Sequence, residues 1–499
     1  LPNTLAVHGT GWTILGLDDG TLQAAGTGLD APVAGNYLSG LKTFFVGSGG
    51  GTVDTDGKDV ALPQTIACDA TPAFTKAGAG TLTLGQTLKW PGDVDVQAGV
   101  LSGALTSGVA CAALPTNLLA RYSSEGGPGI DSSGNTRHGA AWGSALTAVT
   151  DPFGGSALNF PTGSIIAMPM DAVMRGMGTY TVSMWVKAGS VSGTGGTFFT
   201  TRMGNSNDAY QFMLRINSGK FRYMATGSTY NGWANNAIDS TSSVPVNVWF
   251  HCAAVVTGGT SVTLYLNGQL EKTTTGKSGL LFCPPDRPLG GLGFGIGHPY
   301  LTITPSGEFT GQLDDVQIFN RALSGAEVAA LAAAPTPVVP TLRVANGASA
   351  ALQGATAVRT LSGEGYVAGG PLTVLESASP GDAADTPAGA ALLADALVLS
   401  DGITYHCNWS GSLSDALHTG SLTIGGAGTL DLGRAEGQVI NGSYRVVLAT
   451  YDTIAGAENL VAWSIINAGG NGYEAAIVAE NGEVVLTYRS TRGTLMLFK

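Results

Sequence analysis

The sequence predicts an all-β protein, and its composition is the first reason. Of the 499 residues, 75 are glycine and only 12 % are charged, whereas roughly a quarter of the residues in an average globular domain are charged. This composition favours sheets joined by turns over charged surface helices. Short runs of β-branched and aromatic residues between glycines, and an alternating stretch near residue 313, point the same way.

The alternating stretch, residues 313–319, is typical of a strand in a β-sandwich. By the two-residue period of a strand, Asp314 shares a face with Val316 and Ile318, and Asp315 lies on the opposite face. An acidic residue is therefore expected in line with two β-branched apolar residues.

A short helix is predicted directly after this strand. Ser324 and Glu327 have the spacing of a capping box, in which the hydroxyl and the carboxylate each bind a free backbone N–H group. The alanine-rich run behind Ser324 continues as the helix. Strand, turn and capped helix are expected to close one domain.

Residues 311–331 resemble the closing segment of laminin-G-like, concanavalin A-like jelly-roll domains, whose last strand carries paired acids before Asn-Arg-Ala-Leu-Ser and a short helix. Matching segments occur upstream at Leu118–Glu125, Asp131–Asn135, His138–Gly139, Tyr180–Val186, Val248–Val255 and Leu264–Gly268. The resemblance covers residues 115–334 and implies an antiparallel jelly-roll sandwich.

The flanks, residues 1–114 and 342–499, follow a different pattern of brief β-prone runs separated by glycines. The step from Gly80 to Gly99 is about 20 residues, the size of one solenoid coil. These runs resemble autotransporter-associated β-strand repeats, which form β-solenoids on secreted bacterial surface proteins. The sandwich is thus predicted to be inserted into a β-solenoid, with residues 335–341 as a stiff, proline-rich linker.

The charge balance limits the kinds of partner. A net charge of −12 argues against nucleic acid and anionic membranes, because so few Lys and Arg cannot neutralise phosphates. No apolar run has the length of a membrane-spanning helix, and Leu1-Pro2 looks like a processed N-terminus. We expect a secreted protein, extracellular or on the bacterial cell surface.

The resemblance also implies a cation site. In jelly rolls of this type, the loop with Asp131 and Asn135 lies beside the strand with Asp314, and oxygen ligands from both suit a Ca²⁺ ion with roughly six to eight ligands. Glu125 and Asp315 are further candidate ligands. The ion is expected to pin the loop to the sheet. The alternative is that Asp131 and Asn135 only form a turn and Asp314 caps an edge.

An aromatic loop, Tyr230–Asn236, is a candidate carbohydrate site. The rings of Tyr230 and Trp233 could cover the apolar face of a sugar while the amides of Asn235 and Asn236 bind its hydroxyl groups. The alternative is a turn whose Trp233 packs on its own sheet.

Motifs of hydrolytic enzymes are absent from the sequence. Glycosidases on this kind of sandwich typically carry Glu-x-Asp-x-(x)-Glu on one strand, and neither this run nor Gly-x-Ser-x-Gly nor His-Glu-x-x-His occurs. We therefore expect no catalytic residues and no enzyme, although acids and bases from separate coils could still form a lyase site.

Five cysteines without Cys-x-x-Cys spacing favour disulfides in an oxidising compartment over a zinc site. We predict the pairs Cys68–Cys111 and Cys252–Cys283. The remaining Cys407 is then either free and buried or paired with another chain.

The leading hypothesis is a non-enzymatic surface protein that displays a calcium-stabilised sandwich on a β-solenoid for adhesion or assembly. The alternatives are a repeating subunit of a filament, sheath or surface layer, and a polysaccharide hydrolase or lyase whose sandwich binds glycans. Self-association by strand addition would use Thr494–Phe498 or Thr4–Val7. Otherwise, the terminal strand folds back onto its own last coil.

Overall fold

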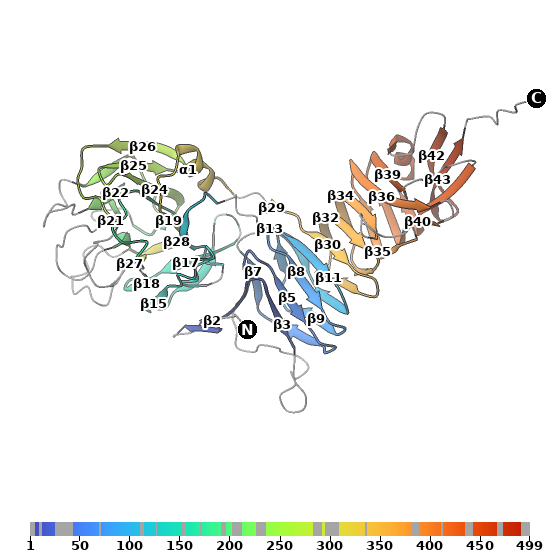
Figure 1. The fold of residues 1–499 in the computed structure, drawn as a ribbon, viewed down its shortest axis with the longest axis horizontal. Coiled ribbons are helices and arrows are strands. Elements are labelled where there is room, and N and C mark those ends of the chain that lie inside the picture. The colour runs from blue at the N-terminus through green and yellow to red at the C-terminus, as the bar shows by residue number, and fades with distance from the viewer. Residues whose placement is uncertain are drawn as a thin grey trace, which may run out of the picture.

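The computed structural model describes residues 5–8, 12–24, 43–68, 71–109, 114–125, 127–151, 153, 155–169, 172–190, 196–201, 212–225, 236–282, 292–294, 309–334, 337–381, 389–410, 413–434, 443–466 and 473–490. These residues form a sandwich of two sheets and an elongated array of parallel strands that extends away from it (Figure 1). The chain is therefore all-β, as predicted.

The sandwich contains an eight-stranded and a seven-stranded sheet. The first sheet consists of β14 (Leu118–Tyr122), β16 (Thr147–Thr150), β17 (Ser156–Phe160), β28 (Gly311–Phe319), β19 (Tyr180–Ala188), β24 (Trp249–Thr257), β25 (Ser261–Leu266) and β26 (Gln269–Thr274). The second consists of β15 (Ala140–Gly143), β18 (Ser164–Met168), β27 (Leu292–Phe294), β20 (Thr197–Thr200), β21 (Phe212–Asn217), β22 (Lys220–Ala225) and β23 (Ile238–Ser243). All of their pairings are antiparallel.

The core of the sandwich lies between the two sheets and is rich in aromatic side chains. The Phe212 ring stacks on Phe199 and on Tyr223, with ring centroids 5.6 Å and 5.5 Å apart. Offset stacking of this kind adds to the free energy that burial of the rings already supplies. The outer face of the eight-stranded sheet carries a smaller apolar cluster that includes Phe319, Tyr265 and Val328.

The predicted helix is present as α1 (Gly325–Leu331), and the capping box at its start is confirmed. The Ser324 hydroxyl accepts a hydrogen bond from Glu327 N, while the Glu327 carboxylate accepts one from Ser324 N at 2.8 Å. Val328 packs into the outer apolar cluster. The helix thereby covers part of the outer face of the sheet.

The rest of the described chain is dominated by two columns of parallel strands, here called the strand stack. One column consists of β3 (Gly20–Gln23), β5 (Gly51–Asp54), β8 (Phe74–Ala77), β11 (Asp93–Val96), β30 (Thr341–Val344), β32 (Thr356–Gly363), β34 (Leu372–Pro380), β36 (Ile403–Ser410), β39 (Gly428–Arg434) and β41 (Ser464–Ile466). The other consists of β6 (Val60–Leu62), β9 (Thr81–Leu84), β12 (Val100–Gly103), β31 (Ser349–Leu352), β33 (Tyr366–Gly369), β35 (Ala391–Leu399), β38 (Ala416–Ile424) and β40 (Ser443–Ala455).

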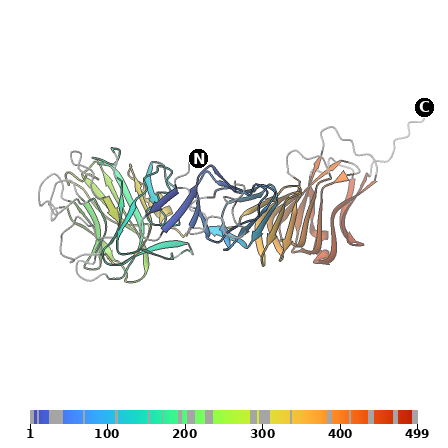
Figure 2. The ribbon, with the colours of Figure 1, turned by 90° about the horizontal axis from the view of Figure 1, so that it is seen from below.

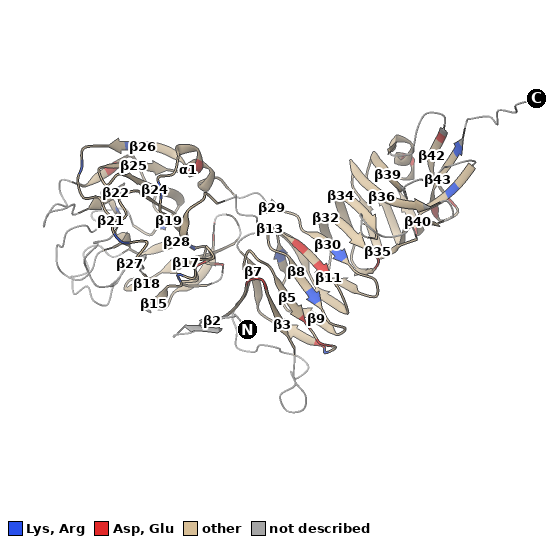
Figure 3. Ribbon diagram, viewed as in Figure 1, with Lys and Arg blue, Asp and Glu red and all other residues tan. Residues whose placement is uncertain are grey.

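Pairing in the strand stack continues across the point where the sandwich is inserted. β11 pairs in parallel with β30, and β12 pairs with β31, although the sandwich lies between these strands in the sequence. The side chains of Asp95 and Arg343 form an ion pair of 3.0 Å across this junction. Figure 3 shows acidic residues on β11 beside a basic residue on β30, and Figure 2 shows the strand stack as one row.

Further elements lie beside the two columns and at their ends. They are β1 (Leu5–His8), β2 (Trp12–Leu17), β4 (Thr43–Val46), β7 (Thr65–Cys68), β10 (Leu88–Trp90), β13 (Leu105–Val109), β29 (Pro337–Val338), β37 (Leu413–Ser414), β42 (Tyr473–Glu480), β43 (Glu483–Ser490) and the 3-10 helix η3 (Ala457–Ala462).

The two segments predicted for strand addition have different outcomes. At the N-terminal candidate, residues 5–8 form β1, which pairs with β2 of the same chain. The C-terminal candidate, residues 494–498, lies outside the described residues. Within the described part of the chain, no helix combines the length and the apolar character needed to cross a membrane.

The cysteines do not all follow the predicted pairing. Cys252 is a free thiol that is fully buried in the sandwich core, so it does not form the predicted bridge with Cys283, which lies outside the described residues. Cys111 also lies outside them, and the Cys68–Cys111 pair stays a prediction. Cys407 is free and buried in the strand stack, which is one of its two predicted states.

Candidate functional site

A β-bulge in β28 places two acidic residues next to each other on the sandwich. The register between β19 and β28 shifts at this point, and Asp315 has a left-handed φ of +49°. An extra residue in one strand interrupts the two-residue alternation. Leu313 and Val316 therefore both face the core, and the prediction that Asp314 shares the face of Val316 is wrong.

Asp314 is the most unusual side chain in this region. It is only 6 % exposed, and its Oδ1 atom has no hydrogen-bond partner. A buried carboxylate without a partner is costly, because its hydration is lost and not replaced. Such an atom needs either a proton or a cation.

The charge around Asp314 is negative. Burial is the main reason why the pKa of Asp314 is well above that of an ordinary aspartate. The neighbouring carboxylates of Asp315, Asp151 and Glu125 raise the pKa further, in that order. Glu125, Asp151 and Asp314 are called the acidic cluster below.

Asp151 lies in the tight connection between β16 and β17, and Glu125, which follows β14, contacts the same connection. Asp151 Oδ1 accepts hydrogen bonds from Phe153 N at 2.6 Å and Gly155 N at 2.9 Å. Glu125 Oε1 accepts one from Ser156 N at 2.7 Å. Each acid thus uses one oxygen to shape the loop.

Gly155 lies between these two carboxylates. A Cβ atom at this position would be 2.2 Å from Glu125 Oε1 and 2.8 Å from Asp151 Oδ2. Both distances are too short for any side chain, so the loop requires glycine here. The two oxygens thus lie directly against the backbone of Gly155.

An aromatic contact anchors this loop beside Asp314. The Phe153 ring packs edge-on against Trp185, with centroids 5.0 Å apart. Trp185 is the residue of β19 that lies opposite Asp314 in the sheet. Loop 151–155 is thereby held over the bulge.

The structure gives Asp131 and Asn135 another role. Asp131 accepts hydrogen bonds from Arg121 N at 2.9 Å, Ser133 N at 2.9 Å and Arg137 N at 2.8 Å. The Asn135 amide donates to Leu118 O at 3.0 Å. Both side chains shape their own loop, and neither is among the groups that act electrostatically on Asp314.

Asp315, the other predicted ligand on β28, forms an ion pair. Its Oδ1 atom lies 2.7 Å from a guanidinium nitrogen of Arg121, whose side chain is 2 % exposed. Asp315 therefore compensates a buried positive charge. Of the acidic cluster, Glu125 and Asp314 were named as candidate ligands from the sequence, and Asp151 was not.

A preassembled metal-ligand set is not present in the described residues: no three His, Cys, Asp or Glu side chains there already surround one point. The donor set nevertheless suits a hard cation, because all its members are carboxylates. Asp314 supplies an unpartnered oxygen, and the close approach of Glu125 and Asp151 to the Gly155 backbone brings their two carboxylates together.

Most of the predicted carbohydrate loop cannot be compared with the structure. Tyr230, Trp233 and Asn235 lie outside the described residues. Asn236 is described, and it is 6 % exposed. This amide is therefore not on the surface.

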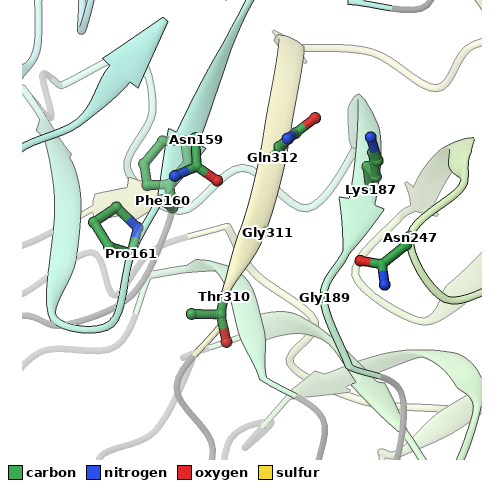
Figure 4. A pocket seen from close by; sticks show the side chains of 9 residues that line it. All are labelled: Asn159, Phe160, Pro161, Lys187, Gly189, Asn247, Thr310, Gly311 and Gln312. Atoms are coloured by element: carbon green, nitrogen blue, oxygen red, sulfur yellow. The ribbon is translucent and has the colours of Figure 1, made fainter. Parts of the chain in front are cut away.

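A different cavity, of about 250 Å³, opens next to the acidic cluster. Its polar side chains are those of Asn159, Lys187, Asn247, Thr310 and Gln312. Figure 4 shows Asn159 and Lys187 on either side of the strand that carries Gln312. Gln312 is two residues before Asp314, so both lie on the outer face of the sheet.

Comparisons with known proteins give different results for curated sequences, solved structures and family models. A search of curated proteins finds no relative of this chain. Domain 4 of AbnA, an extracellular GH43 arabinanase from Geobacillus stearothermophilus, solved with arabinotriose, is 22 % identical over 44 % of this chain and 98 % of that one, with a TM-score of 0.33.

The binding domain of botulinum neurotoxin serotype D is 14 % identical over 43 % of this chain and 50 % of that one, with a TM-score of 0.31. The binding domain of Paraclostridial Mosquitocidal Protein 1 is 17 % identical over 43 % and 52 %, with a TM-score of 0.33. At these scores, the likeness carries no argument about the site. Residues 161–329 match a laminin-G family model described as the concanavalin A-like lectin/glucanases superfamily, and this part of the chain is therefore a domain of that kind.

Proposed function

We propose that this chain is a non-enzymatic, extracellular binding protein that displays a cation-stabilised, glycan-binding sandwich on a β-solenoid. The observation that carries the proposal is the continuous pairing of β11 with β30 and β12 with β31 across the inserted sandwich. An insertion between paired strands leaves the scaffold intact and holds the sandwich at its side. This arrangement suits display.

The β-solenoid is supported by the register of the strand stack. Phe74, Val94 and Leu342 occupy equivalent positions on β8, β11 and β30, and each is paired with the next in parallel. All three are buried. Stacking of equivalent apolar residues is the way in which coils of a solenoid bury one another.

The cation in this proposal is Ca²⁺, held by Glu125, Asp151 and Asp314. The unpartnered Oδ1 atom of Asp314 supports it. When bound, the ion would supply positive charge that holds loop 151–155 to the bulge. No catalytic step is assigned to it.

Melting of the full chain tests the cation. Ca²⁺ that binds only the folded sandwich stabilises it by about 2.7 kcal/mol at a hundred times its dissociation constant. We expect the sandwich transition to move to a higher temperature in millimolar Ca²⁺ than in EDTA, while the strand-stack transition stays in place. Identical melting curves in both buffers would refute the cation site.

Glycan binding requires a separate test, with purified full chain on a glycan array in millimolar Ca²⁺. Selective binding to a set of related glycans is the expected result. An array without any signal would count against the binding function and favour a purely structural role.

A repeating subunit of a filament is a second candidate, favoured by the edge of β42. Among the described strands, β42 pairs only with β43, and Val478 on it is 38 % exposed. An unpaired strand edge is a template for pairing with another chain. Light scattering on the wild-type chain and on Val478→Lys tests this candidate function. The variant should lose any oligomers that form through the edge of β42.

A further inference from the structure

A row of polar side chains crosses three neighbouring strands beside the acidic cluster. Asn159 of β17 pairs with Gln312 of β28, which pairs with Lys187 of β19. The adjoining residues Leu158 and Val186 lie in the core of the sandwich. The side chains of the row therefore point to the outer side of the sheet.

These side chains line the 250 Å³ cavity shown in Figure 4. Asn247 and Thr310 add an amide and a hydroxyl group at one end of it, and Pro161 adds a small apolar surface. The lining thus combines amides, one ammonium group, one hydroxyl group and a small apolar surface. Anionic side chains do not contribute to it.

The polar groups of the row are available for a ligand. Within the described part of the chain, the side chains of Asn159, Lys187 and Gln312 form no hydrogen bonds or ion pairs. An unpaired surface lysine alone is ordinary. Three unpaired polar side chains that meet in one cavity, on three strands in register, form a prearranged set of donors and acceptors.

The chemistry of the lining selects a class of ligand. Each amide both donates and accepts hydrogen bonds, which suits sugar hydroxyl groups, while the Lys187 ammonium group suits a carboxylate. A cavity of about 250 Å³ lies just below the roughly 300–1,000 Å³ of ordinary ligand pockets. It therefore fits one sugar residue better than an extended chain.

We propose that this cavity binds the terminal residue of an acidic glycan, with the carboxylate on Lys187 and hydroxyl groups on Asn159 and Gln312. This inference rests on the proposed binding function and names the ligand class and the position. The acidic cluster lies close by, since Asp314 is two residues from Gln312. Its charge would repel a carboxylate, so binding is measured with Ca²⁺ present.

Isothermal titration of the full chain tests the proposal with two probes that differ only in one group. Methyl galacturonide carries the carboxylate, and methyl galactoside carries a hydroxymethyl group in its place. We expect the galacturonide to bind at least tenfold more tightly. Lys187→Gln should remove this preference, and Asn159→Ala should weaken both probes.

Lys272→Gln is the matched control, because Lys272 is an exposed lysine on β26 of the same sheet and lies outside the cavity. It should leave binding unchanged. Equal affinity for both probes, or a galacturonide affinity that Lys187→Gln does not alter, would overturn the acidic-sugar site. If array glycans still bind in the Lys187→Gln and Asn159→Ala variants, only this inference fails. A wild-type chain that binds neither probe nor any array glycan refutes the proposed function itself.

Discussion

The strand stack and the sandwich each bury an ionisable side chain, and the two side chains differ in their hydrogen-bond partners. Lys76 of β8 is fully buried, in a ladder between Val53 of β5 and Val96 of β11. Its Nζ atom donates to Ala77 O, Gly78 O and Ala98 O at 2.9, 2.6 and 2.8 Å. Every proton of the ammonium group therefore has an acceptor.

Asp314 in the sandwich is equally buried but keeps an oxygen without a partner, next to other acids. A buried charge with complete partners is part of the architecture. A buried carboxylate that has an oxygen without a hydrogen-bond partner and lies near other carboxylates is a candidate binding site for a cation. The comparison indicates a structural role for Lys76 and supports the proposed cation-binding role of Asp314.

The largest expected loss of stability comes from a substitution in the core of the strand stack, and it tests whether this core unfolds independently of the sandwich core. Trp90 is fully buried in the strand stack, contacts Phe74 with ring centroids 5.5 Å apart, and donates to Pro72 O at 2.9 Å. Trp90→Ala should cost about 3–5 kcal/mol and lower the strand-stack transition in calorimetry. The sandwich transition serves as the internal control. A parallel fall of both transitions would mean that the two cores unfold as one unit.

The next largest effect is the dependence of sandwich stability on pH and Ca²⁺, which tests the role of Asp314. Its raised pKa means that the folded form keeps a proton that the unfolded chain loses above its ordinary pKa, so without cation the sandwich loses stability as pH rises. Asp314→Asn should remove both this pH dependence and the shift of about 2.7 kcal/mol expected from Ca²⁺. Thermal melts from pH 4 to 8, in EDTA and in Ca²⁺, measure both.

Asp131→Asn is the matched variant for that experiment. Asp131 accepts three backbone hydrogen bonds in its loop, so this change should lower the melting temperature equally in EDTA and in Ca²⁺. A Ca²⁺ shift lost in both Asp131→Asn and Asp314→Asn would reinstate the ligand set expected from the sequence, which contains both residues.

Lys76 makes a smaller, pH-dependent contribution. Burial lowers the pKa of Lys76 from 10.5 to about 8. Between these values the unfolded chain binds the proton and the folded chain does not, so the contribution of Lys76 to stability should rise with pH, by about 2 kcal/mol from pH 8 to 10. Cys407 in the same strand stack contributes with the opposite sign, because burial raises the pKa of its thiol. Urea denaturation of the strand stack checks this. The difference in unfolding free energy between the wild-type chain and Lys76→Met should change by this amount from pH 8 to 10, and a difference that is independent of pH would exclude a contribution from Lys76.

The smallest effect concerns the junction around the insertion. Arg343 and Asp95 are partly exposed, at 38 % and 23 %, and such ion pairs contribute roughly 0–1 kcal/mol. Arg343→Ala should lower the strand-stack stability by less than about 1 kcal/mol. Arg445→Ala, which breaks another exposed pair far along the strand stack, is the control. A much larger loss at Arg343 would make the junction the weak point of the scaffold.

The sequence alone determined features that depend on local chemistry. The strand-rich class follows from glycine-separated β-prone runs, and the helix after β28 follows from Ser324 and Glu327, three residues apart. The laminin-G-like character of residues 161–329 was readable in the motif around Asp314. Neighbours in sequence are also neighbours in space in these cases, so pattern and contact coincide.

Only the tertiary structure decided the candidate sites. The bulge at Asp315 depends on how β28 pairs with β19, and a two-residue period assumes that no such shift occurs. Asp151 meets Asp314 because β17 pairs with β28 and Phe153 packs on Trp185. The polar cavity joins Asn159, Lys187 and Gln312 from strands that are distant in the chain. Strand order and register arise from the burial of the whole core, and no local stretch of sequence contains that information.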